Sequence, residues 1–130
     1  MSAAYDLATY IQSGGFGTVG TDMGVNGFMD KGDNEVAVFE YSGLPEDATM
    51  GGSVAFEHPK IQLQVRDISS SKAWARCYAI YAYLRGKMDL TLNGHTIQYI
   101  KGTGHPHILS RDELNRPIYI AELEVDRSPE

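Results

Sequence analysis

Hydrophobic residues recur at helical spacing near the start of the chain. This apolar face consists of Ala4, Leu7, Ala8 and Ile11. Ser2 is suited to cap the helix, because its hydroxyl can accept a hydrogen bond from a backbone amide of the first turn. The glycines at 14–15 can adopt the left-handed conformation that ends a helix. The pattern predicts a short first helix with one buried side.

A longer helical stripe follows the serines at 69–71, one of which is suited to be its N-cap. The stripe consists of Ala73, Trp74, Cys77, Ile80, Tyr81 and Leu84. Gly86 is expected to end this helix, and Arg85 and Lys87 lie where the C-terminal dipole favours cations. The spacing predicts that the whole stripe faces the core.

Other segments have the patterns of strands. Residues 35–41 are apolar on both faces, as in a central strand, whereas residues 61–67 alternate strictly. In the second run Ile61, Leu63 and Val65 point to one side, and Gln62, Gln64 and Arg66 point to the other. The glycine-rich residues 16–34 are interpreted as a strand fragment with turns.

Two hairpins are predicted after the second helix. Asn93-Gly94 is a strong turn signal within residues 88–101. Pairing across it puts these side chains on one face: Met88, Leu90, Leu92, Ile97 and Tyr99. A last hairpin runs from residues 107–110 through a polar turn to residues 118–125. Its second strand alternates between two sets of side chains. One set is Tyr119, Ala121, Leu123 and Val125, and the other is Ile118, Ile120, Glu122 and Glu124.

The order of elements predicts an α+β fold, a mainly antiparallel sheet with two helices packed on one face. We expect one domain over residues 1–130 with a mobile loop at about 43–59. The other face of the sheet would be polar and uncovered. It is expected to present Gln62, Gln64, Arg66, Asp89, Thr91, Thr96, Gln98, Glu122 and Glu124.

Composition narrows the class of protein. The chain has 130 residues and a formal net charge of −6, which argues against unspecific nucleic-acid binding, because phosphate affinity comes from clustered cations. The single cysteine, Cys77, cannot form an internal disulfide and fits a reducing compartment. No signal peptide or membrane-spanning run is visible, so we expect no membrane partner.

The sequence shows no set of reactive side chains of the kind that an enzyme active site brings together. Three histidines, His95, His105 and His107, could in principle bind zinc, but Pro106 fixes an extended segment and no cysteine or carboxylate completes the set. Nucleophile-elbow and phosphate-loop motifs are absent. We therefore expect no catalytic residue, no metal and no cofactor.

The remaining candidates for a functional role are surfaces that could contact another protein. Ile118 and Ile120 point away from the predicted core, and exposed aliphatic residues in a row often contact another protein. The segment at 43–56 could act as an arm that adds a strand to a neighbour. The predicted intersubunit interface consists of Leu44, Glu46, Asp47, Met50, Val54, Phe56, Ile118 and Ile120.

Taken together, several segments resemble phage minor capsid proteins, specifically the tail terminator (tail completion) proteins of long-tailed phages (siphoviruses). They are DLATYIQ at 6–12, FGTVGTDM at 16–23, DNEVAVFEYSGLPED at 33–47, GGSVAFEHPKIQLQVRD at 51–67, AIYAYLRG at 79–86, TLNGHTIQYI at 91–100 and SRDELNRPIYIAELEV at 110–125. The likeness spans nearly the whole chain in one order. Leu114 departs from it, in a turn where a more polar residue is expected.

The resemblance implies a viral structural protein of the virion that has no enzymatic activity. Such a subunit forms a homo-hexameric ring that ends the tail tube during tail assembly. The ring joins the tube to the head-tail connector or stopper protein at the tail–neck junction, after assembly in the host cytoplasm. Genomic DNA would pass through the ring without specific binding.

The net charge of the chain suggests how the ring would interact with DNA. Six copies would carry roughly −36, six times the charge of one chain. The polar sheet face could then line the bore and repel phosphates. The predicted lumen-facing residues are Gln62, Gln64, Asp89, Gln98, Glu122 and Glu124.

Three alternatives remain open at this stage. The chain could be a head-completion or neck protein of the same particle, in which case its loss would make heads leak DNA. It could be a small metalloenzyme that uses the three histidines named above. It could also be a host-encoded binding module, which a strictly monomeric state would favour.

Overall fold

The computed structural model describes residues 2–44 and 56–128. These residues form two helices and six strands. In chain order the elements are α1 (Ala3–Ser13), β1 (Met23–Val25), β2 (Glu35–Leu44), β3 (His58–Arg66), α2 (Ser70–Leu84), β4 (Met88–Leu92), β5 (His95–Arg111) and β6 (Pro117–Arg127).

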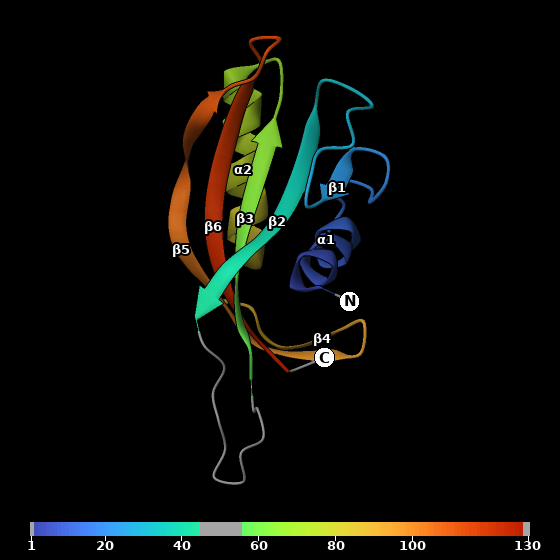
Figure 1. Ribbon diagram of the computed structural model, residues 1–130, viewed down its shortest axis with the longest axis vertical. Coiled ribbons are helices and arrows are strands. Elements are labelled where there is room, and N and C mark those ends of the chain that lie inside the picture. Colours follow the sequence, from blue (N-terminus) through green and yellow to red (C-terminus); the bar gives the residue numbers. More distant parts are fainter. Residues whose placement is uncertain (1, 45–55, 129–130) are drawn as a thin grey trace, which may run out of the picture.

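The strands form one curled sheet in the order β1-β2-β3-β6-β5-β4, with β1 and β2 parallel and the other pairs antiparallel. In Figure 1, β5 borders the sheet on one side, and β1 with α1 borders it on the other. The expected α+β class, with a mainly antiparallel sheet, is confirmed. Neither helix of the described residues is long and apolar enough to cross a membrane.

Both helices begin where the sequence predicts. The Ser2 hydroxyl accepts a hydrogen bond from the Tyr5 amide, and the Ser69 hydroxyl accepts one from the Lys72 amide. On α2, Ala73, Cys77 and Ile80 are buried together with Tyr81 and Leu84. Trp74 was expected in the same stripe but is 43% exposed. A residue next to Ala73 is turned by about 100° around a helix, so Trp74 points along a different side.

The core lies between the sheet and both helices. Cross-strand partners from four strands alternate onto this inner face: Val38 faces Leu63, Leu63 faces Ala121, and Ile100 faces Val125. Together with the apolar faces of α1 and α2, they form one cluster of buried residues. The alternation therefore gives the inner face correctly for Ile61, Leu63 and Val65 of β3 and for Ala121, Leu123 and Val125 of β6.

Strand β5 differs from the prediction. It is one continuous strand of 17 residues, which pairs first with β4 and then along its length with β6. The register shifts at several points along β5, including the stretch around Gly102, Gly104 and Pro106. Such bulges accommodate residues that normally interrupt a strand, and this is why two separate strands were expected there.

The hairpin at Asn93-Gly94 forms as predicted, with both residues at positive φ and Leu92 paired with His95. Its expected apolar face is only partly buried. Ile97 is buried, but Met88 is 60% exposed and Tyr99 is 36% exposed. Figure 1 shows the reason: β4 turns across the lower end of the sheet, away from the vertical strands.

The loop expected at about 43–59 is shorter at both ends, because β2 continues to Leu44 and β3 begins at His58. The centre of the predicted arm, with Glu46, Asp47, Met50 and Val54, lies outside the described residues.

Candidate assembly surfaces

The face of the sheet opposite the helices is built from rows of cross-strand neighbours. One row contains Phe39, Gln62, Glu122 and Gly104, and the next contains Tyr41, Lys60, Glu124 and Lys101. A third row joins Gln64 to Ile120 and Ile120 to His107. We call this surface the outer face. It brings together four of the six residues that were predicted to line a lumen.

The other two predicted lumen residues do not join them. Asp89 and Gln98 are exposed on the β4–β5 hairpin, which turns away from the vertical strands (Figure 1). The curl of the sheet, which a pattern of alternation does not contain, separates them from Gln62, Gln64, Glu122 and Glu124. They remain exposed polar residues, but at another part of the molecule.

Arg66 was also expected to be exposed on the outer face, and this expectation is wrong, because Arg66 is only 3% exposed. Its guanidinium donates to the Gly32 carbonyl at 2.8 Å and lies 4.6 Å from the Phe28 ring centroid. The neighbouring Glu35 carboxylate accepts hydrogen bonds from three backbone amides at 30–32. The loop before β2 therefore folds over this end of the outer face.

The charge of the outer face is mixed. Glu124 lies between two cross-strand lysines, Lys60 on β3 and Lys101 on β5. Partial burial raises the pKa of the Tyr41 hydroxyl, and the negative charge of Glu122, to which it is hydrogen-bonded, raises that pKa further. The carboxylates of this face are thus accompanied by cations and hydrogen-bond donors, which the sequence prediction of an acidic surface did not include.

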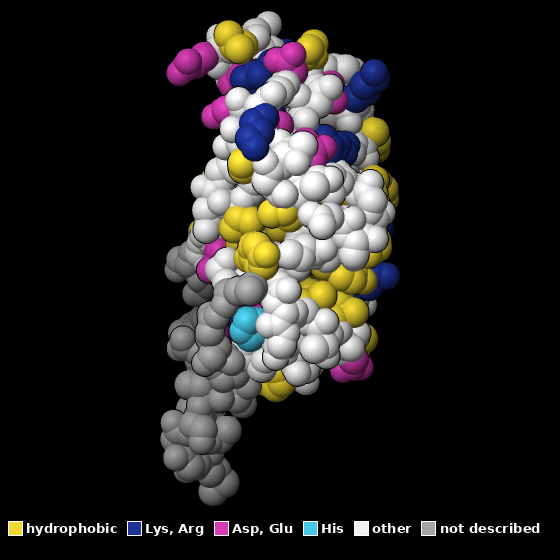
Figure 2. All heavy atoms as spheres, turned by 90° about the vertical axis from the view of Figure 1, so that its right-hand side faces the viewer, with side chains coloured by type: hydrophobic (Ala, Val, Ile, Leu, Met, Phe, Trp, Pro, Cys, Tyr) yellow, Lys and Arg dark blue, Asp and Glu magenta, His cyan; other side chains and the backbone are white. Residues whose placement is uncertain are grey.

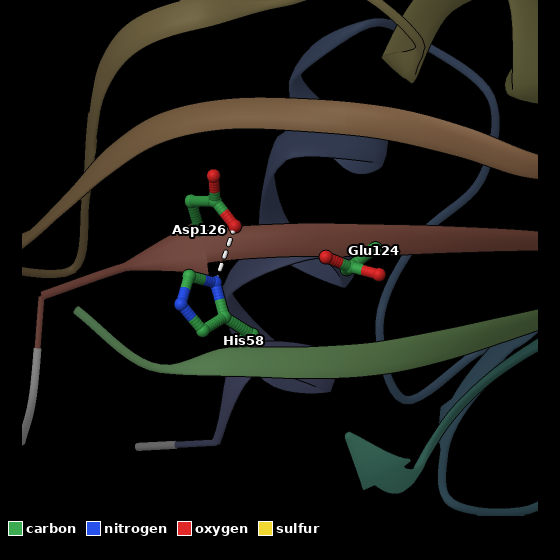
Figure 3. Close-up of side chains that lie close together, drawn as sticks. All are labelled: His58, Glu124 and Asp126. Carbon is green, nitrogen blue, oxygen red and sulfur yellow. Dashed lines mark hydrogen bonds and ion pairs between the residues drawn. The ribbon is translucent and has the colours of Figure 1, made fainter. Parts of the chain in front are cut away.

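Three side chains on the outer face could hold a divalent cation. The donor atoms of His58, Glu124 and Asp126 lie within 4.8 Å of one another, the one such group among the described residues. Figure 3 shows His58 on β3 pointing at Asp126 on β6, and the His58 Nδ1 lies 2.7 Å from the Asp126 Oδ1. A cation would have to replace this hydrogen bond and compete with Lys60 and Lys101 beside Glu124. We therefore treat the group as a histidine–aspartate pair that fastens β3 to β6.

The three histidines that could have formed a zinc site do not converge on one point, because each has different contact partners. The His95 Nδ1 is 2.9 Å from the buried Asp6 carboxylate. The His105 ring meets Tyr78 and Tyr81 of α2 edge-on, and the His107 Nδ1 lies 2.8 Å from the His105 carbonyl. The metal-ligating group found in the described residues includes none of the three.

The aliphatic pair on β6 is less accessible than expected. Ile120 is only 5% exposed, so the expectation that it forms an open contact patch is wrong. It lies between Gln64 and His107 on the neighbouring strands, whose longer side chains flank it. Ile118 is half-buried. Phe56, at the end of the predicted arm, is half-buried as well.

One end of the molecule carries a network of charges around the β5–β6 turn. Arg116 donates to Asp112 at 2.7 Å and to Asp33 at 3.0 Å, and these contacts raise the pKa of the guanidinium. A hydrogen bond from Arg116 holds the pKa of the Asp112 carboxyl below its usual value. An open cavity of about 460 Å³ lies here, lined by Asp30, Arg66, Asp112, Glu113, Leu114 and Arg116.

A second network, which the sequence did not reveal, lies in the interior. The Asp6 carboxylate is fully buried and pairs with Arg127 of β6 at 3.0 Å. The Asn93 side chain donates to the same carboxylate at 2.9 Å. Asp6 falls between apolar residues of α1, and a charged residue at the edge of a helical stripe is a signal that could have suggested a buried pair.

The position of Cys77 does not suit a reactive thiol. Cys77 is buried in the core, and this burial raises the pKa of its thiol to about 12. A thiol with so high a pKa carries almost no thiolate at neutral pH, and the thiolate is the reactive form.

The comparisons with known proteins agree with this picture of a structural subunit. A solved structure matches with a TM-score of 0.59 and 13% sequence identity, over 98% of this chain and 94% of the other; at this identity the likeness shows the fold alone. No curated protein matches the chain. A family model described as "Bacteriophage tail terminator protein" matches residues 10–128. The expected resemblance is confirmed: the chain belongs to the bacteriophage tail terminator family and is a structural component of the phage virion.

Proposed function

We propose that this chain forms a homo-hexameric ring that ends the growing tail tube and joins it to the head-tail connector or stopper protein. The family supports the terminator role, and the two-layer fold supports a ring. Both helices pack on one face of the sheet, so the outer face remains available to line a central opening. The ring would lie at the tail–neck junction, after assembly in the host cytoplasm.

The observation that carries this proposal is the row structure of the outer face. Gln62, Gln64, Glu122 and Glu124 lie on adjacent strands, and the cross-strand register fixes their positions. A rigid polar surface of this kind suits a bore through which DNA moves without specific contacts. Lys60 and Lys101 beside Glu124 reduce the net charge, so the surface would neither bind phosphates strongly nor repel them strongly.

The charge network at the β5–β6 turn suits a docking end of the ring. Leu114 is 70% exposed at the tip of this turn, next to the open cavity lined by Asp112 and Arg116. An exposed leucine beside a charged cavity is a suitable contact for the tube protein or the connector. The proposal thus assigns the ends of the strands to the axial partners.

Labelling of intact virions tests the location. An antibody raised against the purified chain and coupled to gold is expected to label one position per particle, where the tail meets the head. Label along the tail shaft, over the capsid or at the distal tip would contradict the proposal.

A further inference from the structure

Helix α2 carries a second stripe of side chains that faces away from the core. The Trp74 ring stacks on the Tyr78 ring, with centroids 5.3 Å apart and planes at 16°. About two turns beyond Tyr78, the Arg85 guanidinium lies 6.0 Å from the Tyr78 centroid and 5.4 Å from the Tyr81 centroid. These residues follow one another at helical spacing, so they form a continuous strip along the helix.

The strip continues onto β5. The His105 ring lies 5.9 Å from the Tyr78 ring. Ile108 pairs with Tyr119, whose hydroxyl is 2.8 Å from the Ser70 hydroxyl, so Ile108 lies beside the first turn of α2. We call this surface the α2–β5 edge: Trp74, Tyr78, His105, Ile108 and Leu109.

Large apolar side chains are exposed on this edge. Trp74 is 43% exposed, Ile108 is 47% exposed and Leu109 is 49% exposed. Tryptophan is the residue most often found at the energetic centre of protein interfaces, because it buries a large area at a small cost in entropy. Such a row on one side of a subunit indicates a contact with another protein.

The α2–β5 edge is also basic, although the chain as a whole is acidic. Neither α2 nor β5 contains an acidic residue. Arg85, which lies beside Tyr78 and Tyr81, and Arg111 at the end of β5 are exposed basic residues of this edge. The partner of this edge should therefore offer carboxylates beside an apolar surface.

The opposite edge of the same sheet has these properties. Residues 16–41 contain five acidic residues and one basic residue. Asp30 and Asp33 pair with arginines of their own chain, yet they remain 76% and 53% exposed and can meet further cations. Figure 2 views this side and shows hydrophobic side chains across its middle, below a charged upper end. We call this surface the α1–β1 edge.

Neither border of the sheet is suited to add another strand through backbone hydrogen bonds. β1 has only three residues, and β5 contains Pro106 within a stretch of shifted register. Proline and bulges prevent strand addition, because they remove or misalign the hydrogen-bonding groups. A partner of either border is therefore expected to bind through side chains.

We propose that the α2–β5 edge of one copy binds the α1–β1 edge of the next copy of this chain. Figure 1 shows the two edges on opposite sides of the sheet, which is the arrangement that head-to-tail contacts require. The contact would bring Arg85 and Arg111 of the aromatic edge to the exposed carboxylates of Asp30 and Asp33 on the other edge. This inference rests on the proposed ring and names the surfaces that close it.

Two substitutions block one edge each and leave the core untouched. Leu109→Glu places a charge among the apolar residues of the α2–β5 edge. Thr21→Arg adds a cation to the α1–β1 edge, where it would meet the cations of the partner; the native side chain is exposed. Met88→Glu is the matched control, because Met88 is a 60% exposed apolar residue of β4, outside both edges.

Sedimentation velocity and tryptophan fluorescence measure the contact directly. Trp74 is the single tryptophan, so its emission should shift to shorter wavelength and resist quenching by acrylamide as the chain associates. Leu109→Glu and Thr21→Arg should each raise the dissociation constant by about 30-fold or more, as expected for loss of a central contact. Met88→Glu should associate as the wild type does. Equal association of all three variants, or rings in which Trp74 stays fully quenchable, would overturn the proposal.

Rescue of a phage that lacks the gene provides the second test. Neither edge variant should restore infectious particles, although both should fold, as judged by circular dichroism and melting. Rescue by either folded variant would overturn the proposed contact. If deletion of the chain leaves tail length normal, the proposed function fails instead, and the two failures are thereby distinguished.

Discussion

The carboxylate of Asp6 lies 3.0 Å from the Arg127 guanidinium, and this contact joins the first helix to the last strand across 121 positions of sequence. Asp6 is fully buried and Arg127 is 3% exposed. The Arg127 guanidinium also lies 3.5 Å from Glu57, which forms a backbone bridge with Arg127 just before β3. One buried ion pair thus holds together α1, β6 and the start of β3.

Asp6→Ala is expected to destabilise the chain by about 3–5 kcal/mol, because it leaves the Arg127 charge buried without its main partner. Urea unfolding measured by circular dichroism gives the free energy of unfolding. Asp33→Ala is the control: Asp33 pairs with Arg116 at 3.0 Å but is 53% exposed, so the loss should be about 1 kcal/mol or less. Equal losses for the two variants would mean that burial of the Asp6 pair has no energetic consequence.

The Asp112–Arg116 contact predicts a specific acid sensitivity. Because hydrogen bonding by Arg116 lowers the pKa of the folded carboxyl below its ordinary value of 3.8, the pair stabilises the fold above that pH. The stabilisation is lost as the pH falls through the lowered pKa. Asp112→Asn should therefore melt at a lower temperature than the wild type near neutral pH, and the difference should shrink in acid below pH 3.8. A difference that stays constant down to the acid range would contradict this assignment.

Gly102 is expected to tolerate no side chain. A Cβ at this position of β5 would overlap the hydroxyl and ring of Tyr81, a buried residue of α2. Gly102→Ala should cost about 1–3 kcal/mol, as overpacking of a core usually does. Gly32→Ala is the control, since a Cβ there meets nothing, and its effect should stay within about 0.5 kcal/mol. Similar unfolding curves for both variants would show that Tyr81 can move aside.

The proposed bore makes a prediction about DNA release. Glu122→Lys with Glu124→Lys would join Lys60 and Lys101 in a continuous basic stripe on the outer face. Such a stripe binds phosphates, so assembled particles should eject their DNA more slowly, most clearly at low salt. Fluorescent dye uptake by ejected DNA measures the rate. Glu113→Lys, in the exposed β5–β6 turn, should leave the rate unchanged; an unchanged rate in the double variant would remove the outer face from the path of DNA.

Local signals predicted much of the fold. The hydroxyls of Ser2 and Ser69 cap the helices, and Asn93-Gly94 turns the hairpin, because each acts on neighbouring backbone. The alternation of Ile61, Leu63 and Val65 correctly gives the buried face of β3, since side chains alternate in every strand.

The features that were not predicted from the sequence depend on contacts between segments that are far apart in the chain. Arg66 looked like an exposed residue of an alternating strand, and only the loop at 28–34 explains its burial. Ile120 looked open, because its cover comes from neighbouring strands. Trp74 looked like a core residue because it is apolar and lies next to Ala73, but it points to a different side of the helix and is 43% exposed.

Tail length is the most direct test of the central claim that this chain stops growth of the tail tube. Electron micrographs of cells infected with a phage that lacks the gene should show tails of variable, excessive length and full heads without tails. Supplying the chain from a plasmid should restore one uniform length. Tails of normal, uniform length in its absence would contradict the account.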